Sequence, residues 1–291
     1  MSGVTFYDGT VSTEGDELYY KVRGEGKPLL FIAPAGGNGD GYYPVACILA
    51  DEYKVITYDR RANTRSTKNF PNDFDIRQQS RDAVAVLNAA GETSAIVVGN
   101  SSGAVIALDL ATAYPEAVDA AIIHEAAVPS VLPDAEAVRW HEFFKSCYAL
   151  GKRKGAAWGA MKFYFGVELP AVRLMMATMK VPKYMKQDKT TCTVERIASK
   201  EATDILIFNE LLPVTGYRPD FEALRNSGVK IFIGCGQYGL KKNAWYAEAA
   251  KLLADRLSCD FVAFPGHHGE YMSNPIPWAN VLRETIKKAG R

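Results

Sequence analysis

Residues 94–106 carry the pattern in this chain that points most directly to chemistry. The segment reads Ser-Ala-Ile-Val-Val-Gly-Asn-Ser-Ser-Gly-Ala-Val-Ile, and Gly99, Ser101 and Gly103 form a Gly-x-Ser-x-Gly turn. A sharp turn from a strand into a helix strains the backbone at its tip, and flanking glycines remove the Cβ atoms that would clash there. The pattern predicts a nucleophile elbow, in which Ser101 holds its hydroxyl above the edge of a sheet.

By itself, a Gly-x-Ser-x-Gly pattern is also typical of an ordinary turn that caps a helix. Here an apolar run at 95–98 precedes the turn, and a longer apolar run at 104–114 follows it. A strand before the turn and a helix after it are the context that a nucleophile elbow requires. We therefore favour a nucleophilic serine, with the N–H of Ser102 at the helix start as a donor to a negative oxygen.

A serine hydroxyl needs a neighbouring base at neutral pH, and histidine suits that role because its pKa lies near neutrality. The chain has four histidines. His267 and His268 lie in a glycine-flanked loop directly after the apolar strand expected at 260–264, so one of them is the candidate base. His124 ends a strand and is expected to be structural, whereas His141 is a candidate for contact with a substrate.

The third group of such a site is a carboxylate that orients the imidazole and stabilises its charged form. The loop after the strand expected at 229–235 is the usual place for it, but residues 236–243 contain no acid. Glu125 ends the preceding strand at the same edge of the sheet, and it gives the order serine, acid, histidine along the chain. We therefore assign the acid to Glu125, with Asp220 and Glu222 as weaker alternatives.

Composition excludes several classes of function. The chain of 291 residues has 48% hydrophobic residues and a net charge of +1 without a basic arm, which argues against nucleic acid as the main partner. Its cysteines lack Cys-x-x-Cys spacing, so we expect free thiols, no zinc site and no disulfide framework. They are Cys47, Cys147, Cys192, Cys235 and Cys259. Without a hydrophobic leader or a bilayer-length apolar run, we expect a cytoplasmic protein with no membrane partner.

Strand and helix patterns alternate around these residues. A hairpin is predicted over residues 4–22. Six further strands are expected at 29–33, 53–58, 95–98, 118–123, 229–235 and 260–264. The alternation predicts a mostly parallel eight-stranded sheet flanked by helices, with residues 1–127 and 221–291 as the core.

The alternation stops between residues 128 and 220. This segment shows helical patterns without a clear strand, so we expect a helical lid inserted after the sixth strand. It is rich in aromatic residues, lysine and methionine, including Met175, Met176 and Met179. Most of the apolar side chains are expected to pack the lid on the core, and some to line an apolar pocket. Trp158 and His141 are the candidates for substrate binding.

Four segments together resemble the α/β-hydrolase superfamily, and the resemblance covers essentially the whole chain. They are the loop with Gly36-Gly37, the Tyr-Asp-Arg-Arg at 58–61, the turn at 99–103 and the Pro-Gly-His-His at 265–268. The resemblance implies the α/β-hydrolase fold and a serine hydrolase that requires no metal and no cofactor.

Within that superfamily, the Asn-Ser-Ser-Gly-Ala at 100–104 and the His-Glu at 124–125 are similar to the fungal zearalenone lactone hydrolases. In that group the acid is a glutamate after the sixth strand, which fits Glu125. The superfamily has a Pro-Gly-Gly-His pattern in which the histidine is fourth, and this selects His268 over His267 as the base.

The same resemblance implies the oxyanion donors. The glycine-rich stretch 34–41 follows a buried strand and lets the backbone approach a ligand closely. Its position matches the place of an oxyanion donor in that group, so the N–H groups of Gly36 and Ser102 become the donors. Asn100 and Ala62 depart from the residues usual at their positions.

The sequence thus predicts a serine hydrolase that cleaves an ester or lactone of a fairly apolar small molecule. Ser101 attacks the carbonyl, His268 takes its proton and Glu125 holds His268. Two other classes stay open: cleavage of a carbon–carbon bond or a cyclisation on the same fold, and a non-catalytic ligand-binding receptor on a hydrolase scaffold. No metal, cofactor, nucleic acid or membrane is implied, and a homodimer is left open.

Overall fold

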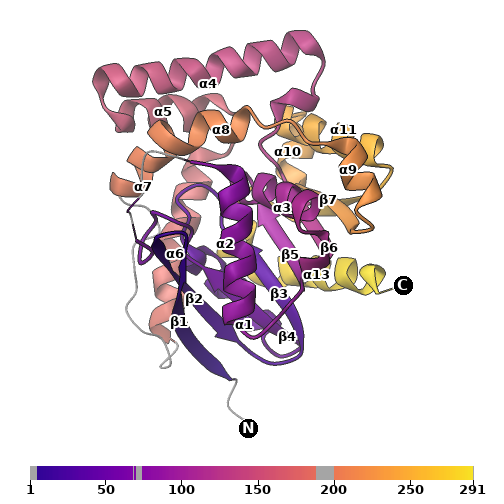
Figure 1. Ribbon diagram of the computed structural model, residues 1–291. Coiled ribbons are helices and arrows are strands. Elements are labelled where there is room, and N and C mark those ends of the chain that lie inside the picture. Colours follow the sequence, from indigo (N-terminus) through magenta and orange to yellow (C-terminus); the bar gives the residue numbers. More distant parts are fainter. Residues whose placement is uncertain (1–4, 68, 70–73, 188–199, 291) are drawn as a thin grey trace.

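The computed structural model describes residues 5–67, 69, 74–187 and 200–290 (Figure 1). In this part of the chain, eight strands form one sheet in the order β1-β2-β4-β3-β5-β6-β7-β8. They are β1 (Phe6–Thr13), β2 (Asp16–Arg23), β3 (Lys27–Ile32), β4 (Tyr53–Tyr58), β5 (Ala95–Asn100), β6 (Val118–His124), β7 (Lys230–Gly236) and β8 (Asp260–Phe264). Strand β2 is antiparallel to β1 and β4, and all other neighbours are parallel. The predicted mostly parallel eight-stranded sheet is confirmed.

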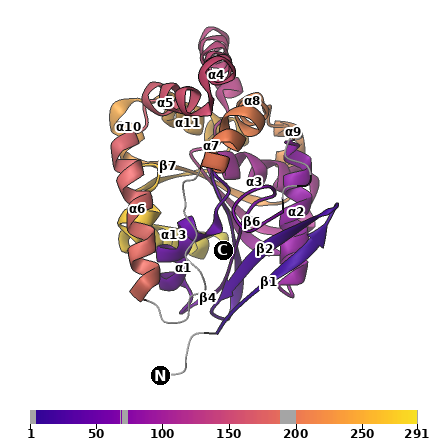
Figure 2. The same ribbon diagram turned by 90° about the vertical axis from the view of Figure 1, so that its left-hand side faces the viewer.

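Helices cover both faces of this sheet. The helices of the core are α1 (Tyr43–Leu49), α2 (Ile76–Ala89), α3 (Ser102–Ala113), α9 (Phe221–Asn226), α10 (Gln237–Lys242), α11 (Trp245–Leu257), α12 (Glu270–Ser273) and α13 (Pro275–Ala289). Short 3-10 helices occur at Gly39–Tyr42, Pro115–Ala117 and Pro129–Val131. In Figure 2, α2 and α3 lie on one side of the sheet, and α1 and α13 lie on the other.

The hydrophobic pattern of the strands explains this layering. Along β3, Leu30 and Ile32 belong to the buried cluster that α2, α3 and α11 cover. The alternate residues Leu29 and Phe31 belong to a second cluster, which α1 and α13 cover. Successive side chains of a strand point to opposite faces, so a strand buried on both faces is continuously apolar.

Residues 236–243 do not form the loop expected from the sequence. Residues 237–242 are helical and form α10, with Lys241 and Lys242 in the last turn, where positive charge favours a helix terminus. Asn243 then adopts a left-handed conformation with φ of 50° and ends the helix. This difference concerns the site, because a loop after β7 is the usual place for the acid and here the helix α10 begins directly after that strand.

In the described part of the inserted segment, five α-helices and a π-helical turn follow β6. They are α4 (Asp134–Lys154), α5 (Ala156–Gly166), α6 (Ala171–Gln187), α7 (Lys200–Ile205), the π-helical turn Leu206–Glu210 and α8 (Leu211–Thr215). Helices α4, α5, α7 and α8 lie together at the top of Figure 1, whereas α6 runs down one side of the molecule in Figure 2.

Helix α6 packs on the core and does not cover the elbow. Ala177 and Val181 are buried in the cluster that α1 and α13 cover. Met175, Met176 and Met179 lie on the other side of α6 and are 58%, 55% and 65% exposed. The expectation that these methionines pack the lid or line a pocket is therefore wrong, because helical periodicity turns them outward while Ala177 and Val181 face the core.

The described residues contain four free cysteines and no helix suited to a membrane. Cys47, Cys147, Cys235 and Cys259 are free thiols. Cys192 lies outside the described residues. Across the described ranges, no helix combines the length and the apolar character needed to cross a bilayer.

Candidate active site

The turn between β5 and α3 has the strained geometry predicted for Ser101. Ser101 adopts φ of 56° and ψ of −118°, in a region that non-glycine residues rarely occupy. A Cβ atom on Gly99 would lie 2.3 Å from the carbonyl oxygen of Gly103. A Cβ atom on Gly103 would lie 2.2 Å from the carbonyl oxygen of Ile32. Only glycine fits at both positions, so the local sequence dictates this turn.

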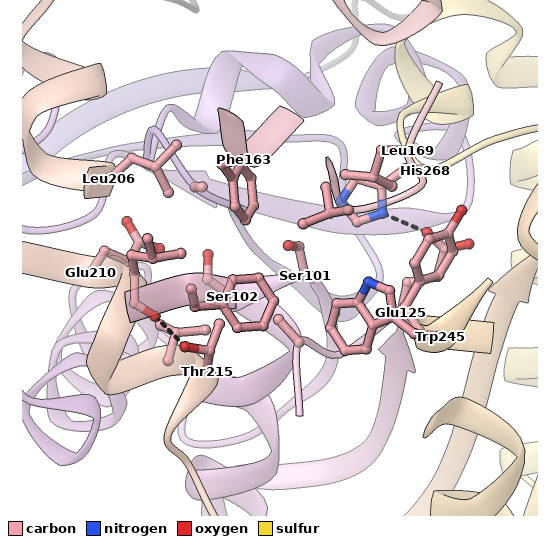
Figure 3. A pocket seen from close by; sticks show the side chains of 17 residues that line it. Ser101, Ser102, Glu125, Phe163, Leu169, Leu206, Glu210, Thr215, Trp245 and His268 are labelled. Carbon is pink, nitrogen blue, oxygen red and sulfur yellow. Dashed lines mark hydrogen bonds and ion pairs between the residues drawn. The ribbon is translucent and has the colours of Figure 1, made fainter. Parts of the chain in front are cut away.

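Ser101 lines a cavity of about 40 Å³ between the core and the inserted helices (Figure 3). Ala35, Ser102, Glu125, Trp245 and His268 line it from the core. Phe144, Phe163, Val167, Leu169, Leu206 and Val214 are among the residues that line it from the inserted segment. The lining is mainly apolar, and the cavity is smaller than the roughly 300–1,000 Å³ of a typical ligand pocket.

His268 and Glu125 meet beside this cavity. The Nδ1 atom of His268 lies 2.5 Å from Oε2 of Glu125, and both side chains are buried. The other oxygen of Glu125, Oε1, accepts a hydrogen bond from the N–H of Gly236 at 2.7 Å. The thiol of Cys235 donates to the same oxygen, with a distance of 3.4 Å from Sγ. Glu125 is thus held at both oxygens and fixes the orientation of the imidazole.

These contacts set the charge of Glu125. Burial alone would raise its pKa, but the hydrogen bond from His268, the charges of the nearby imidazoles and the N–H of Gly236 together lower the pKa to about 2. Glu125 is therefore ionised at neutral pH. An ionised carboxylate on Nδ1 orients the imidazole and stabilises its positive charge when Nε2 takes a proton.

Ser101 and His268 line the same cavity, and both are labelled in Figure 3. Among the described residues, no hydrogen bond joins the Ser101 hydroxyl to the imidazole. Such bonds are often long in ligand-free enzymes and shorten when the substrate is bound. The arrangement brings a nucleophile, a base and an acid to one edge of the sheet.

The structure separates the alternative residues from this site. The Nε2 atom of His267 lies 3.2 Å from Oε2 of Glu270, and burial lowers the pKa of His267. Asp220 caps the start of α9 through its side chain, and Glu222 is exposed in the first turn of that helix. None of the three candidates lines the cavity.

His124 packs away from the cavity and contacts Asn100. It is fully buried, and its Nδ1 atom lies 2.7 Å from the amide nitrogen of Asn100. Burial lowers the pKa of His124 to about 4, so the ring is neutral at neutral pH. The same amide nitrogen lies 3.4 Å from the carbonyl oxygen of His268. Asn100 thus joins the end of β6 to the loop that carries His268.

The two candidate oxyanion donors have free N–H groups. Gly36 adopts φ of 88° in a turn that the N–H of Gly37 closes on the carbonyl oxygen of Pro34, at 2.9 Å. Ser102 begins α3, where N–H groups lack partners within the helix. Within the described ranges, neither N–H donates to a protein acceptor. The side chain of Ser102 lines the cavity, and Ala35 lies there beside Gly36.

The structure does not bring Trp158 or His141 to the cavity. Trp158 is 50% exposed, and the ammonium of Lys154 lies over its ring. Phe163, on the same helix, does line the cavity. Five residues of α-helix correspond to a rotation of about 140°, so Trp158 faces outward when Phe163 faces inward. His141 is half-buried on α4.

A buried ion pair beside the cavity was missed by the sequence analysis. The Nη2 atom of Arg60 lies 2.7 Å from Oε1 of Glu210 and 2.9 Å from the carbonyl oxygen of Pro34. The backbone N–H of Arg60 donates to the carbonyl oxygen of Gly37 at 2.7 Å. Arg60 therefore links the glycine-rich loop to the inserted segment. Nothing local in the sequence indicates this pair, because its members lie 150 residues apart.

Comparison with known proteins agrees with this architecture. A family described as alpha/beta hydrolase fold matches residues 27–157. A Bacillus subtilis (strain 168) protein named Uncharacterized hydrolase YraK is 28% identical over 290 residues, which cover 98% of each chain. Among solved structures, a thermophilic esterase from Thermogutta terrifontis has a TM-score of 0.73 at 20% identity, covering 97% of this chain and 99% of that one. Est816, described as an N-acyl homoserine lactone degrading enzyme, has a TM-score of 0.69 at 21% identity, covering 95% and 99%. At these identities the two structures show a common fold.

Proposed function

We propose that the chain is a serine hydrolase of the α/β-hydrolase superfamily that cleaves an ester or lactone of an apolar small molecule, and the matching family model and the shared fold support this. The observation that carries the proposal is the contact of His268 with an ionised Glu125 at the cavity that Ser101 lines. A carboxylate hydrogen-bonded to the Nδ1 side of a histidine is the arrangement that lets the imidazole take the proton of a serine hydroxyl.

In the proposed reaction, Ser101 attacks the carbonyl carbon while His268 takes the hydroxyl proton at Nε2. Glu125 stabilises the imidazolium that forms. The negative oxygen of the tetrahedral intermediate accepts hydrogen bonds from the N–H groups of Gly36 and Ser102, each of which lowers the barrier by roughly 3–4 kcal/mol. The imidazolium then protonates the leaving alcohol, and water hydrolyses the acyl-enzyme with His268 as the base.

The lining of the cavity supports an apolar substrate. Phe163, Leu169, Leu206 and Val214 surround the space beyond the serine. A lactone substrate is favoured by the resemblance of residues 100–104 and 124–125 to the zearalenone lactone hydrolases, and the lactone-degrading Est816 shares the fold. Esters and lactones react through the same tetrahedral intermediate, so one site serves both.

Labelling with a fluorophosphonate tests the proposal directly. We expect stoichiometric labelling of Ser101, located by intact mass and peptide mapping, and its loss in Ser101→Ala and His268→Ala. His267→Ala is the matched control and should keep the label, because His267 pairs with Glu270 and lies off the cavity. A folded wild-type protein that takes no label would contradict the proposal.

Labelling of Ser101 would show an activated serine but not which reaction it catalyses, so the products must be measured. Nitrophenyl esters and lactones of increasing chain length should be hydrolysed, with product masses that show net addition of water. Carbon–carbon cleavage of a β-diketone, or an isomerised product without water, would place the chain in one of the other reaction classes of the fold. Turnover far below one per minute with tight product retention would indicate a receptor.

A further inference from the structure

Glu210 places a carboxylate oxygen without a partner in the wall of the cavity. The side chain is 1% exposed and ends the π-helical turn Leu206–Glu210. Its Oε1 atom is paired with Arg60, but Oε2 has no hydrogen-bond partner among the described residues. In Figure 3, Glu210 and His268 lie on opposite sides of Ser101. The free oxygen is therefore placed to contact a part of the substrate away from the reacting carbonyl.

Among the described residues no donor bonds this oxygen, although the hydroxyl groups of Ser102 and Thr215 line the same cavity. Leu206, Leu211 and Val214 line the cavity next to it. The partner cation is incompletely bonded as well, since Nε and Nη1 of Arg60 lack hydrogen-bond partners in the described chain. A buried ion pair with unsatisfied atoms is a poor way to stabilise a fold, because desolvation offsets its Coulomb attraction. The arrangement is better explained by a ligand that completes it. π-Helical turns also occur frequently at functional sites.

The charge of the pair limits what this ligand can be. A carboxylate oxygen accepts hydrogen bonds, so the complementary group must be a donor. Arg60 already neutralises Glu210, so an ammonium group would bring an unpaired positive charge into an apolar cavity. A carboxylate on the substrate would face the Oε2 atom as a second anion. A neutral hydroxyl fits, because it donates one hydrogen bond and carries no charge.

We propose that Glu210 is a specificity residue that accepts a hydrogen bond from a hydroxyl group of the substrate. This proposal rests on the proposed hydrolase function. The substrates it predicts are esters or lactones that carry a hydroxyl group, with an apolar chain between that hydroxyl and the scissile carbonyl. Sites built to bond a hydroxyl discriminate strongly against analogues that lack it, because the buried acceptor is then left unpaired.

Three sets of chromogenic substrates test this proposal on the wild-type protein. We would compare 4-nitrophenyl hexanoate, octanoate and decanoate with the same esters carrying a terminal hydroxyl or a terminal methoxy group. At the chain length that reaches Glu210, the hydroxyl should raise kcat/KM roughly 10- to 100-fold over the unsubstituted ester. The methoxy group accepts but cannot donate, so the methoxy ester should be the poorest of the three. Equal kcat/KM for hydroxylated and unsubstituted esters at every length would overturn the proposal.

Glu210→Gln separates recognition from a structural role. The amide nitrogen of glutamine donates, and the oxygens of a hydroxyl and of a methoxy group both accept. The preference for the hydroxylated over the methoxy ester should therefore fall toward unity, while the methoxy ester gains relative to the unsubstituted ester. A purely structural effect would change all three esters alike. Asp82→Asn is the matched control, because it removes a carboxylate from the buried pair with Arg61 at a place away from the cavity. Its preference for the hydroxylated over the methoxy ester should equal that of the wild type, and an unchanged preference of this kind in Glu210→Gln would overturn the proposal.

A binding measurement distinguishes failure of this proposal from failure of the hydrolase function. Methyl 8-hydroxyoctanoate should bind to the Ser101→Ala protein at least 10-fold more tightly than methyl octanoate in calorimetry, whether or not the wild type turns over. Fluorophosphonate labelling without any hydroxyl preference would refute the role of Glu210 alone. Absent labelling together with preferred binding of the hydroxylated ester would refute the hydrolase and leave Glu210 as a binding residue.

Discussion

The Nδ1 atom of His268 lies 2.5 Å from Oε2 of Glu125, although 143 residues separate the two in the sequence. Glu125 follows β6, His268 follows β8, and β7 lies between these strands in the sheet. Glu125 adopts φ of 49°, and its Oε1 atom accepts the N–H of Gly236 at the end of β7. The carboxylate therefore crosses the end of the intervening strand and is bonded to it. This geometry explains how an acid after β6 can serve a histidine after β8.

Replacing Glu125 by glutamine tests the role of this contact. The amide keeps the size of the side chain but removes the charge that stabilises the imidazolium and favours the wrong tautomer of His268. We expect kcat for a nitrophenyl ester to fall by about 10⁴-fold. Circular dichroism should show an intact fold. Glu222→Gln, on the exposed side of α9, is the control and should keep wild-type turnover. Turnover near the wild-type value in Glu125→Gln would assign the acid to another residue.

The buried His124 should make the protein less stable in mild acid. Burial lowers its folded-state pKa to about 4 from an ordinary value of 6.5. Between these values, the unfolded chain binds the proton more readily than the folded one. Stability is therefore retained above pH 6.5 and lost as the pH falls toward 4, with a slope of up to about 1.4 kcal/mol per pH unit. Glu125 adds a further loss below about pH 4.5, because its folded-state pKa is lowered.

Urea unfolding at pH 7, 6 and 5 checks this prediction. The free energy of unfolding should fall more steeply with pH in the wild type than in His124→Gln. The slope should not vanish in the variant, because burial lowers the pKa of His267 as well. Identical slopes in the two proteins would show that His124 does not couple stability to pH.

The sheet and the elbow could be predicted because their signals are local. Continuous apolar runs mark strands that are buried on both faces, and Leu29 to Ile32 show the alternate burial directly. The glycines at 99 and 103 are required by backbone contacts within a few ångströms of the turn. Such features depend on neighbouring residues, so the amino-acid sequence displays them.

The inserted segment could not be predicted to the same depth, because its contacts are long-range. Trp158 points outward because the opposite face of α5 packs inward. Both faces of this helix carry apolar residues, so the sequence does not indicate which face is buried. The pairing of Arg60 with Glu210 joins residues 150 positions apart. The spacing of the cysteines predicts only that Cys235 is a free thiol, whereas its Sγ atom lies 3.4 Å from Oε1 of Glu125. Each of these depends on how the inserted helices or the strand ends meet in space.

Replacing Gly103 by alanine should prevent the elbow from forming. The added Cβ would lie 2.2 Å from the carbonyl oxygen of Ile32, which belongs to the rigid centre of the sheet. We expect a loss of about 1–3 kcal/mol or more in the free energy of unfolding, and a lower rate of fluorophosphonate labelling. Gly41→Ala is the matched control, because no atom of the described residues lies within 4 Å of the position of its Cβ. Equal stability of the two variants in urea would contradict the packing argument.

The buried cluster around Arg61 should contribute more to stability than a surface ion pair of the same type. Its Nη1 atom lies 2.6 Å from Oδ2 of Asp16, and its Nη2 atom lies 2.6 Å from Oδ1 of Asp82. All three side chains are buried, and they join the β1–β2 hairpin to α2. Arg61→Met would leave two carboxylates without their cation, at a cost of about 3–5 kcal/mol.

Arg81→Met is the control, because it removes an ion pair that is partly exposed, and its effect on the free energy of unfolding is compared with that of Arg61→Met. Arg81 lies on the same helix as Asp82 and pairs with Glu14, but both members of that pair are partly exposed. Solvent screens such pairs, so we expect the loss of Arg81 to cost less than about 1 kcal/mol. Urea unfolding of both variants at pH 7 measures the difference. A cost for Arg61→Met no greater than that for Arg81→Met would mean that desolvation of the three buried charges cancels their attraction, and that the hairpin is held to α2 by its apolar contacts alone.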